Sequence, residues 1–325
     1  MSASVSSSLT ALLLGVSPVL LTAQGTPPTP VQSPTVTPMA ASAVYVRPAP
    51  PGELVDVGSG RRIHIECRGP KTEVTVVIEA GLSQFPAHGS YGPSQDSIAT
   101  FAHVCTYDRA GLGWSDAATL PVTHERMVDD LHRVLRAKGV TGPLVLVGHS
   151  MGGLLVRRYA QQFPAQVHAV VLLDATPEEM LFTDAAKAER AALVQRIAAG
   201  LRGAKAGTPV MALPAGTAPE VMLSFTPEVL SAVQQEYEAI DRVPDSMRRT
   251  GGYGTLGDRP LVVVRRGKVA NPDAPAEQRW RAWQEGMLSL STRSRLVVAE
   301  QAGHAIAYEQ PSIVADVVRT LLTAK

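Results

Sequence analysis

The segment Gly148-His149-Ser150-Met151-Gly152 decides the fold, because it joins a short apolar run, 144–147, to a helical pattern over 151–162. A serine flanked by glycines between a buried strand and a helix predicts a very sharp turn that lifts the serine hydroxyl above the sheet edge. Side chains at positions 148 and 152 would clash with facing backbone in such a turn. The Met151 N–H then lies at the helix N-terminus, where negative charge is favoured.

Strand patterns alternate with helical patterns on both sides of this turn, which predicts an α/β fold with a mostly parallel sheet and helices on both faces. The strand runs are short and rich in β-branched residues, and they cover 53–57, 61–67, 74–78, 103–107, 144–147, 167–173, 261–264 and 296–299. The helical patterns in this part of the chain cover 123–138, 151–162, 276–290 and 312–322.

A stretch without a strand signal interrupts the alternation over 175–259, where 185–201 and 227–240 are helical in pattern. We therefore expect a core of 52–174 and 260–325, with 175–259 inserted as a helical cap. Within the core, the alternation over 61–67 predicts a half-buried strand, with Arg62, His64 and Glu66 on the opposite face from the aliphatic residues.

The N-terminal region differs from the rest in composition. Residues 9–21 form an apolar stretch too short to span a bilayer, and a small-residue site follows it, so 1–23 fits a signal peptide cut after Ala23. Residues 1–8 contain no Lys or Arg, and the alternative is a disordered tail. Residues 24–51 contain eight prolines and read as an extended linker. On this interpretation the protein is exported, to the periplasm or beyond.

Composition excludes several classes of protein. The chain has 325 residues, with 30 Lys and Arg against 29 Asp and Glu. The resulting net charge of +1 is not the strong basic excess typical of nucleic-acid-binding proteins, so we expect no nucleic-acid partner. The sequence contains no run of 18 apolar residues, so we predict no stable membrane span. Two cysteines form neither a disulfide framework nor a Cys-rich zinc site. We expect neither a cofactor nor a metal.

The turn at Ser150 and three further segments resemble the α/β-hydrolase fold superfamily, of the serine hydrolase or esterase type with a helical cap. The further segments are Glu79-Ala80-Gly81-Leu82, Asp108-Arg109-Ala110-Gly111-Leu112-Gly113-Trp114-Ser115 and Ala302-Gly303-His304. The resemblance covers 52 to the C-terminus apart from the cap. It implies an eight-stranded, mostly parallel sheet flanked by helices, with chemistry at the carboxyl ends of the strands.

A serine hydroxyl needs a base, and the base needs an acid that fixes its tautomer. His304 follows the last predicted strand and suits the chain order of the family, so we expect it to be the base. The acid is open between Asp174, which closes the strand 167–173 and is favoured, and Asp273 or Glu300, because the family places its acid after either the sixth or the seventh strand.

The resemblance places two N–H donors for an oxyanion at Met151 and Leu82, although many members have His-Gly where this chain has Ala80-Gly81. Asp108, Arg109 and the glycines that follow are interpreted as loop structure. His88 is a weaker candidate for lining the site.

These residues lead us to expect a serine hydrolase that cleaves carboxylic esters through an acyl-enzyme on Ser150, acting on a small-molecule ester with a small or medium apolar acyl group. A peptidase, a lactonase or a ligand-binding member without catalysis remain alternatives. Cys67 and Cys105 lie on strands that are neighbours in the usual order of the fold, and they form either a disulfide or two buried thiols.

Overall fold

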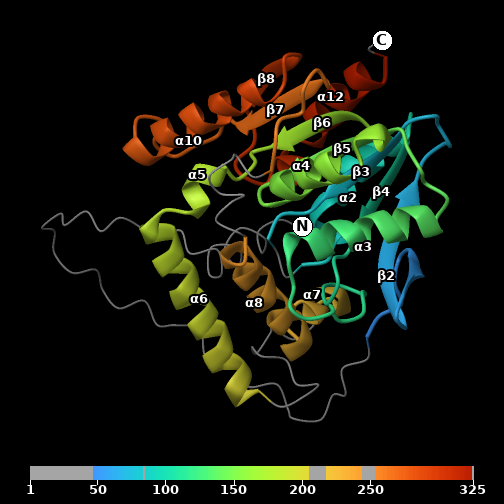
Figure 1. Cartoon of the computed structure of the whole chain (residues 1–325), viewed down its shortest axis with the longest axis vertical. Helices are drawn as coiled ribbons and strands as arrows, with labels where there is room; N and C mark the ends of the chain where they lie inside the picture. Colours follow the sequence, from blue (N-terminus) through green and yellow to red (C-terminus); the bar gives the residue numbers. More distant parts are fainter. Residues whose placement is uncertain (1–46, 83–84, 205–216, 244–252, 324–325) are drawn as a thin grey trace, which may run out of the picture.

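The computed structural model describes residues 47–82, 85–204, 217–243 and 253–323 of the chain (Figure 1). The predicted signal peptide, 1–23, and residues 24–46 of the predicted linker lie outside the described residues. The predicted linker contacts the folded body at the first residues that the structure describes. The Arg47 side chain donates to the Gly113 carbonyl at 2.6 Å, and the Trp114 indole donates to the Pro48 carbonyl at 2.8 Å. The chain therefore contacts the folded body from residue 47 onward.

One sheet of eight strands forms the centre of the molecule, in the order β1-β2-β4-β3-β5-β6-β7-β8. The strand β2 is antiparallel to β1 and β4, and all other neighbours pair in parallel, which confirms the expected mostly parallel sheet. The strands are β1 Glu53–Gly58, β2 Arg61–Arg68, β3 Thr75–Glu79, β4 His103–Tyr107, β5 Leu144–His149, β6 Val167–Leu173, β7 Leu261–Arg266 and β8 Ser294–Ala299.

Helices cover both faces of this sheet (Figure 1). The helices α3 and α4 pack on one face, and α2, α11 and α12 pack on the other. Their bounds are α2 Ala87–Ala99, α3 His124–Ala137, α4 Gly152–Gln162, α10 Pro275–Gly286, α11 Ile306–Glu309 and α12 Pro311–Thr323, with short 3₁₀ turns at Pro164–Gln166 and Met287–Leu290. Thr123 caps α3 as a helix start requires, because its side chain accepts from Arg126 N–H.

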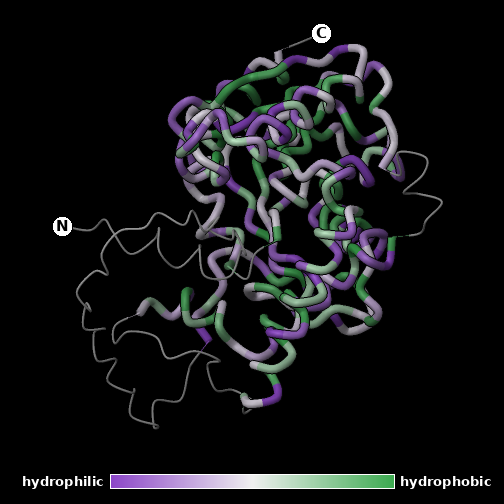
Figure 2. Tube along the Cα trace, turned by 90° about the vertical axis from the view of Figure 1, so that its left-hand side faces the viewer, coloured by the Kyte–Doolittle hydropathy of each residue, from purple (hydrophilic) through white to green (hydrophobic). Residues whose placement is uncertain are grey.

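The hydrophobic core lies in two layers, one on each side of the sheet. The central strands β3 and β6 are buried along almost their whole length, as continuous apolar runs predict for strands covered on both faces. Figure 2 shows hydrophobic residues running through the middle of the larger body and hydrophilic residues mostly on its outer turns. Burial of this kind is the main favourable term in folding.

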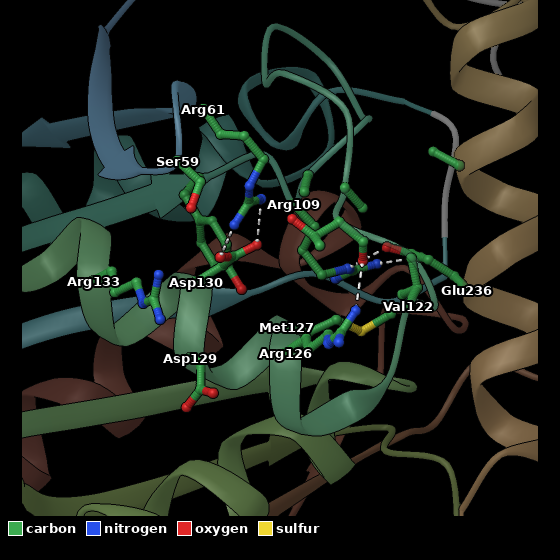
Figure 3. A pocket seen from close by; sticks show the side chains of 15 residues that line it. Ser59, Arg61, Arg109, Val122, Arg126, Met127, Asp129, Asp130, Arg133 and Glu236 are labelled. Carbon is green, nitrogen blue, oxygen red and sulfur yellow. Dashed lines mark hydrogen bonds and ion pairs between the residues drawn. The ribbon is translucent and has the colours of Figure 1, made fainter.

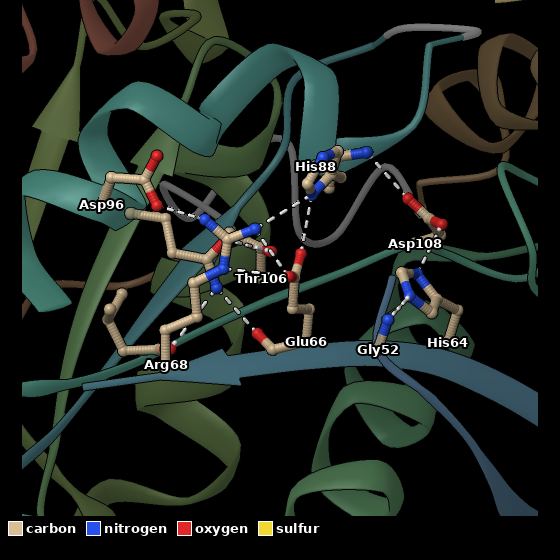
Figure 4. Close-up of polar contacts among 11 residues, drawn as sticks. Gly52, His64, Glu66, Arg68, His88, Asp96, Thr106 and Asp108 are labelled. Carbon is tan, nitrogen blue, oxygen red and sulfur yellow. Dashed lines mark hydrogen bonds and ion pairs between the residues drawn. The ribbon is translucent and has the colours of Figure 1, made fainter. Parts of the chain in front are cut away.

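The prediction of a half-buried β2 was wrong on one face. His64 and Glu66 are buried at 1% and 7% exposure, whereas Arg62 is exposed. The His64 imidazole contacts Asp108 at 2.8 Å, and Glu66 accepts from Arg68 and contacts His88 on α2 (Figure 4). Polar residues are buried here because polar and charged partners, Arg68 on the same strand and His88 and Asp108 from other segments, satisfy them, which a period of two does not reveal.

Helices between β6 and β7 form a second, smaller layer. They include α5 Glu178–Leu181, α6 Asp184–Gly203, α7 Pro219–Leu223 and α8 Pro227–Asp241. The helices α6 and α8 pack against each other, and Figure 1 shows them apart from the sheet. A separate small cluster of buried side chains joins this layer to the loop after β4, and it consists of Leu112, Ile197, Val229, Ala232 and Val233.

The two cysteines form a disulfide. Cys67 on β2 and Cys105 on β4 are directly paired in the antiparallel ladder, and their Cα atoms lie 4.1 Å apart. Of the two alternatives left by the sequence, the structure has the bridge.

Within the described residues, no helix is both long enough and apolar enough to cross a membrane.

Candidate active site

Ser150 occupies the turn between β5 and α4 in a backbone conformation that L-residues rarely adopt, with φ at +51°. A non-glycine residue in this region costs roughly 1–3 kcal/mol and persists only where its surroundings hold it. Here the Ser150 N–H donates to Leu173 O at 3.1 Å, and the Ser150 carbonyl accepts from Gly153 and Thr176 N–H, both at 3.0 Å. Neighbouring backbone from β6 and α4 therefore holds the strained turn.

The glycines of the turn are required by close backbone approach. A Cβ on Gly148 would lie 2.6 Å from Gly152 O, and a Cβ on Gly152 would lie 2.5 Å from Glu79 O. Both distances are far inside a normal contact, so only glycine fits at either position. This confirms the physical reason for the glycines that the sequence indicated.

Asp174 and His304 lie together although 130 residues separate them in the sequence. The His304 Nδ1 atom is 2.6 Å from Asp174 Oδ2. Asp174 follows β6 with φ at +41° and its side chain is fully buried, whereas the His304 ring, between β8 and α11, is 39% exposed. The structure thus brings together the favoured acid and the expected histidine. Asp273 and Glu300 are both exposed, and the described contacts join neither of them to His304.

Asp174 accepts from three further donors that the sequence did not indicate. The Trp280 indole N–H of α10 donates to Oδ1 at 2.8 Å, and Arg266 at the end of β7 donates from its backbone N–H to Oδ1 at 3.2 Å and from Nη1 to Oδ2 at 2.9 Å. Burial alone would raise the pKa of Asp174, but His304, Arg266 and Trp280 together outweigh it and hold the pKa below its usual value. Asp174 is therefore an ionised acceptor at neutral pH.

The Ser150 hydroxyl is turned toward Thr176, with 3.3 Å between the two hydroxyl oxygens. In the described part of the chain, Ser150 Oγ makes no hydrogen bond to His304. Serine–histidine contacts of this kind are often long before substrate binds and tighten in the complex. The His304 ring is close by, since its centroid lies 4.7 Å from that of His149, the residue before Ser150.

His149 forms a fixed chain of hydrogen bonds beside Ser150. Its Nε2 must carry the proton, because it lies 2.8 Å from the His304 carbonyl, so Nδ1 accepts from the Tyr91 hydroxyl at 2.9 Å. Tyr91 in turn accepts from Gly81 N–H at 2.8 Å. Burial and the neighbouring His304 lower the pKa of His149 to about 3, so the ring stays neutral. His149 therefore links the segments that carry Gly81 and His304.

The two expected oxyanion donors flank Ser150. Met151 directly precedes α4, and Gly81 lies so close that a Cβ there would be 2.9 Å from Ser150 Cβ. Neither Met151 N–H nor Leu82 N–H donates to any described residue. Within the described residues, neither amide therefore has a protein acceptor.

Two groups of polar residues lie away from Ser150. His88, considered as a lining residue, instead contacts Glu66 at 2.8 Å and the Arg68 side chain (Figure 4). Among the described residues, one cluster has metal-ligand spacing, namely Cys67, His103 and Cys105. Its two sulfurs are joined in the disulfide, which leaves no thiolate for a metal.

A cavity of about 270 Å³ opens between the β1–β2 turn, α3 and α8 (Figure 3). Arg61 and Asp130 form a bidentate pair at one end of it, and Arg109 and Glu236 lie at the other. Ser150, Asp174 and His304 do not line this cavity, so it is distinct from the site at Ser150.

Comparison with known proteins agrees with this architecture. Residues 83–215 match the family model of the alpha/beta hydrolase fold. The YqjL protein of Bacillus subtilis is 26% identical over 265 residues, which cover 78% of this chain and 86% of that protein.

Solved structures give the same result. An esterase from Thermogutta terrifontis superposes with a TM-score of 0.60 at 21% identity, over 83% of this chain and 96% of that one. An esterase from Exiguobacterium antarcticum gives 0.60 at 18% identity, over 84% and 100%. With the eight-stranded sheet and the strained serine turn, these likenesses show that the chain has the α/β-hydrolase fold.

Proposed function

We propose that this chain is a serine hydrolase that cleaves carboxylic esters of small molecules through an acyl-enzyme on Ser150. The observation that carries the proposal is the 2.6 Å contact between buried Asp174 and His304, beside the strained turn at Ser150. A serine at such a turn, a histidine and a buried carboxylate that orients the histidine form the set of groups that acyl transfer requires.

Proton transfer follows from the tautomer that Asp174 selects. Because ionised Asp174 accepts from Nδ1–H of His304, the Nε2 atom of that ring is left as an acceptor. On binding of an ester, the Ser150 hydroxyl leaves Thr176, gives its proton to Nε2 and attacks the ester carbonyl carbon. The C–O bond to the alcohol then breaks, and His304 returns the proton to the departing oxygen.

Hydrolysis of the acyl-enzyme repeats these steps with water. Nε2 of His304 takes a proton from water as the water oxygen bonds to the acyl carbon. The bond to Ser150 Oγ then breaks, His304 returns the proton to Oγ, and the acid is released. In both tetrahedral intermediates the negative oxygen accepts from Met151 N–H and Leu82 N–H. Fixed amide donors aimed at developing charge supply a large part of the rate in such sites.

The choice of carboxylic esters rests on two supports. The structures from Thermogutta terrifontis and Exiguobacterium antarcticum described above are esterases with the same fold. The helices between β6 and β7 carry apolar side chains, of which Leu181 and Leu223 are buried and Met180 is exposed, and an apolar layer of this kind suits a small or medium apolar acyl group better than a charged one.

A fluorophosphonate probe and a panel of p-nitrophenyl esters from acetate to octanoate test the proposal. The wild-type protein should be labelled and should hydrolyse the shorter esters. Ser150→Ala should lose labelling, and its turnover should fall on the order of a millionfold. The exposed serine variant Ser289→Ala is the matched control and should behave as wild type. Labelling and turnover that survive in Ser150→Ala would refute the assignment.

A further inference from the structure

Arg109, interpreted from the sequence as loop structure, is a buried cation whose five N–H groups all have partners. Its Nε and Nη2 donate to the two carboxylate oxygens of Glu236 at 2.6 and 2.8 Å. Its Nη1 donates to Glu79 Oε1 at 2.8 Å and to Ala80 O at 2.7 Å. Nη2 also donates to Gly81 O at 2.8 Å. The Arg109 side chain thus donates hydrogen bonds to two consecutive backbone carbonyls beside Ser150, those of Ala80 and Gly81.

This charge cluster is costly to bury. The side chains of Arg109, Glu79 and Glu236 are at most 3% exposed. Burial raises the pKa of Glu79, although Arg109 opposes the rise. Replacing a buried ion pair by apolar residues is often neutral or stabilising, so the cluster is weak evidence for a contribution to stability. A role for Arg109 in positioning groups beside Ser150 explains better why this buried charge cluster is present.

The geometry of two peptide units gives Arg109 such a role. The unit between Ala80 and Gly81 is held at both ends, because its C=O accepts from Arg109 and its N–H donates to Tyr91. Among the described residues, the unit between Gly81 and Leu82 has a partner at its C=O alone, which again accepts from Arg109. It is trans, so its N–H points away from its C=O and therefore away from the guanidinium. That N–H belongs to Leu82.

We propose that Arg109 is a positioning residue that orients the Leu82 N–H as an oxyanion donor, and that Glu236 on α8 holds Arg109 in place. The inference rests on the proposed function. The cation also lies at the carbonyl end of both peptide dipoles, where it polarises them and strengthens donation from the opposite ends. Figure 3 shows the Arg109–Glu236 pair. Because Arg109 also bonds to Ala80 O and Gly81 O, this pair links α8 to the segment that carries Leu82.

The variants Arg109→Met, Arg109→Lys and Glu236→Gln test the proposal. For each, kcat and KM are measured with a p-nitrophenyl ester, and active sites are counted with the fluorophosphonate probe. An alkyl trifluoromethyl ketone is the second reporter, because its adduct with Ser150 places a negative oxygen between the two amides.

Arg109→Met should lower kcat per active site by about a hundredfold, within the range for loss of one oxyanion donor, while KM changes less than threefold. The inhibition constant of the ketone should rise by the same factor as kcat falls, because both depend on binding to the tetrahedral state. Arg109→Lys keeps the positive charge but lacks the paired N–H donors of the guanidinium. This variant and Glu236→Gln should each lower kcat per active site by about tenfold.

Arg190→Met is the matched control, because Arg190 is also buried and paired, with Asp241, in the inserted layer. It should lower the melting temperature without changing kcat per active site or the ketone constant. If Arg109→Met does not fold, Glu236→Gln and Arg109→Lys carry the test. Active variants whose kcat and ketone constant match wild type would overturn the inference alone, whereas a wild-type protein that neither reacts with the probe nor hydrolyses esters would overturn the proposed function.

Discussion

Asp174→Asn is a sharp perturbation because the surroundings of the carboxylate decide how the new amide must sit. Oδ1 of Asp174 accepts from the Trp280 indole and from the backbone N–H of Arg266, and neither of these groups can act as an acceptor. An amide nitrogen placed there would face two donors. At the Oδ2 position the NH₂ would face one fixed donor, Nη1 of Arg266, and Nδ1 of His304, whose proton can move to the other ring nitrogen. The asparagine is therefore expected to put its oxygen at the Oδ1 position and its NH₂ at the Oδ2 position.

The NH₂ at that position then faces Nδ1 of His304, which in the wild-type protein donates its hydrogen bond to the aspartate. His304 can satisfy the amide only by moving its proton to Nε2. The ring nitrogen that should take the Ser150 proton is then already protonated. The rigid donors of Trp280 and Arg266 thus force the wrong tautomer, although the shape of the side chain is unchanged.

A comparable aspartate-to-asparagine change in a serine triad costs about ten-thousandfold in turnover, and we expect a loss of that size here. The substitution also removes the charge that faces Arg266, whose other partner, Glu277, remains at 2.7 Å. Charge-assisted hydrogen bonds contribute about 1.5–3 kcal/mol each, so some stability is lost as well. Turnover of a p-nitrophenyl ester is therefore measured well below the melting temperature, with near-ultraviolet circular dichroism as a check of folding.

Asp273→Asn is the matched control, because Asp273 is exposed just before α10 and its carboxylate has no hydrogen bond or ion pair within the described residues. It should retain wild-type turnover. A folded Asp174→Asn protein that stays within tenfold of wild-type turnover would refute the role of Asp174 in fixing the His304 tautomer. An inactive Asp273→Asn protein would indicate that the acid is Asp273, in the loop after β7.

Two further predictions concern stability. The bridge between Cys67 and Cys105 closes a segment of 38 residues, so Cys67→Ser with Cys105→Ser should lower the free energy of unfolding by up to about 4 kcal/mol, and the denatured, unreduced wild-type protein should show no free thiol; two titratable thiols would contradict the bridge. The pKa of His149 is lowered to about 3 and that of His124 to about 4, so between pH 5 and 6.5 the unfolded chain binds more protons than the folded one, and stability should rise with pH by up to about 1.4 kcal/mol per pH unit for each histidine. Urea unfolding across this range checks the slope, which should lose roughly half of its value in His149→Gln.

Much of the fold could be predicted from local patterns. The strands and the helices with a clear apolar stripe appear close to their expected positions, and Ser150 and His304 lie at the ends of elements that the patterns identified. Helix α2 was missed, because Gly89, Gly92 and Pro93 lower its helix propensity and leave no amphipathic period. It forms because its buried side chains pack against the sheet, and tertiary packing of this kind overrides propensity.

The contacts that complete the site could not be predicted. Trp280 and Arg266 reach Asp174 from 106 and 92 residues away, and Arg109 meets Glu236 across 127. Each side chain is ordinary in its own segment, since a tryptophan on a helix or an arginine at a strand end has many uses. Only the strand order and the insertion of α8 bring these residues together.

The strand order also explains why the carboxylate that contacts His304 follows β6 rather than β7. The strands β6 and β7 pair in parallel, so their carboxyl ends meet at one edge, and the Asp174 N–H donates to Val264 O at 2.7 Å. After β7 the chain is pulled toward the segment that carries His304, because Gly267 and Lys268 N–H both donate to Ala302 O. That turn leaves Asp273 in solvent. The loop after β6 therefore supplies the carboxylate of Asp174. Arg266 on β7 and Trp280 on α10 supply the donors that keep this carboxylate ionised.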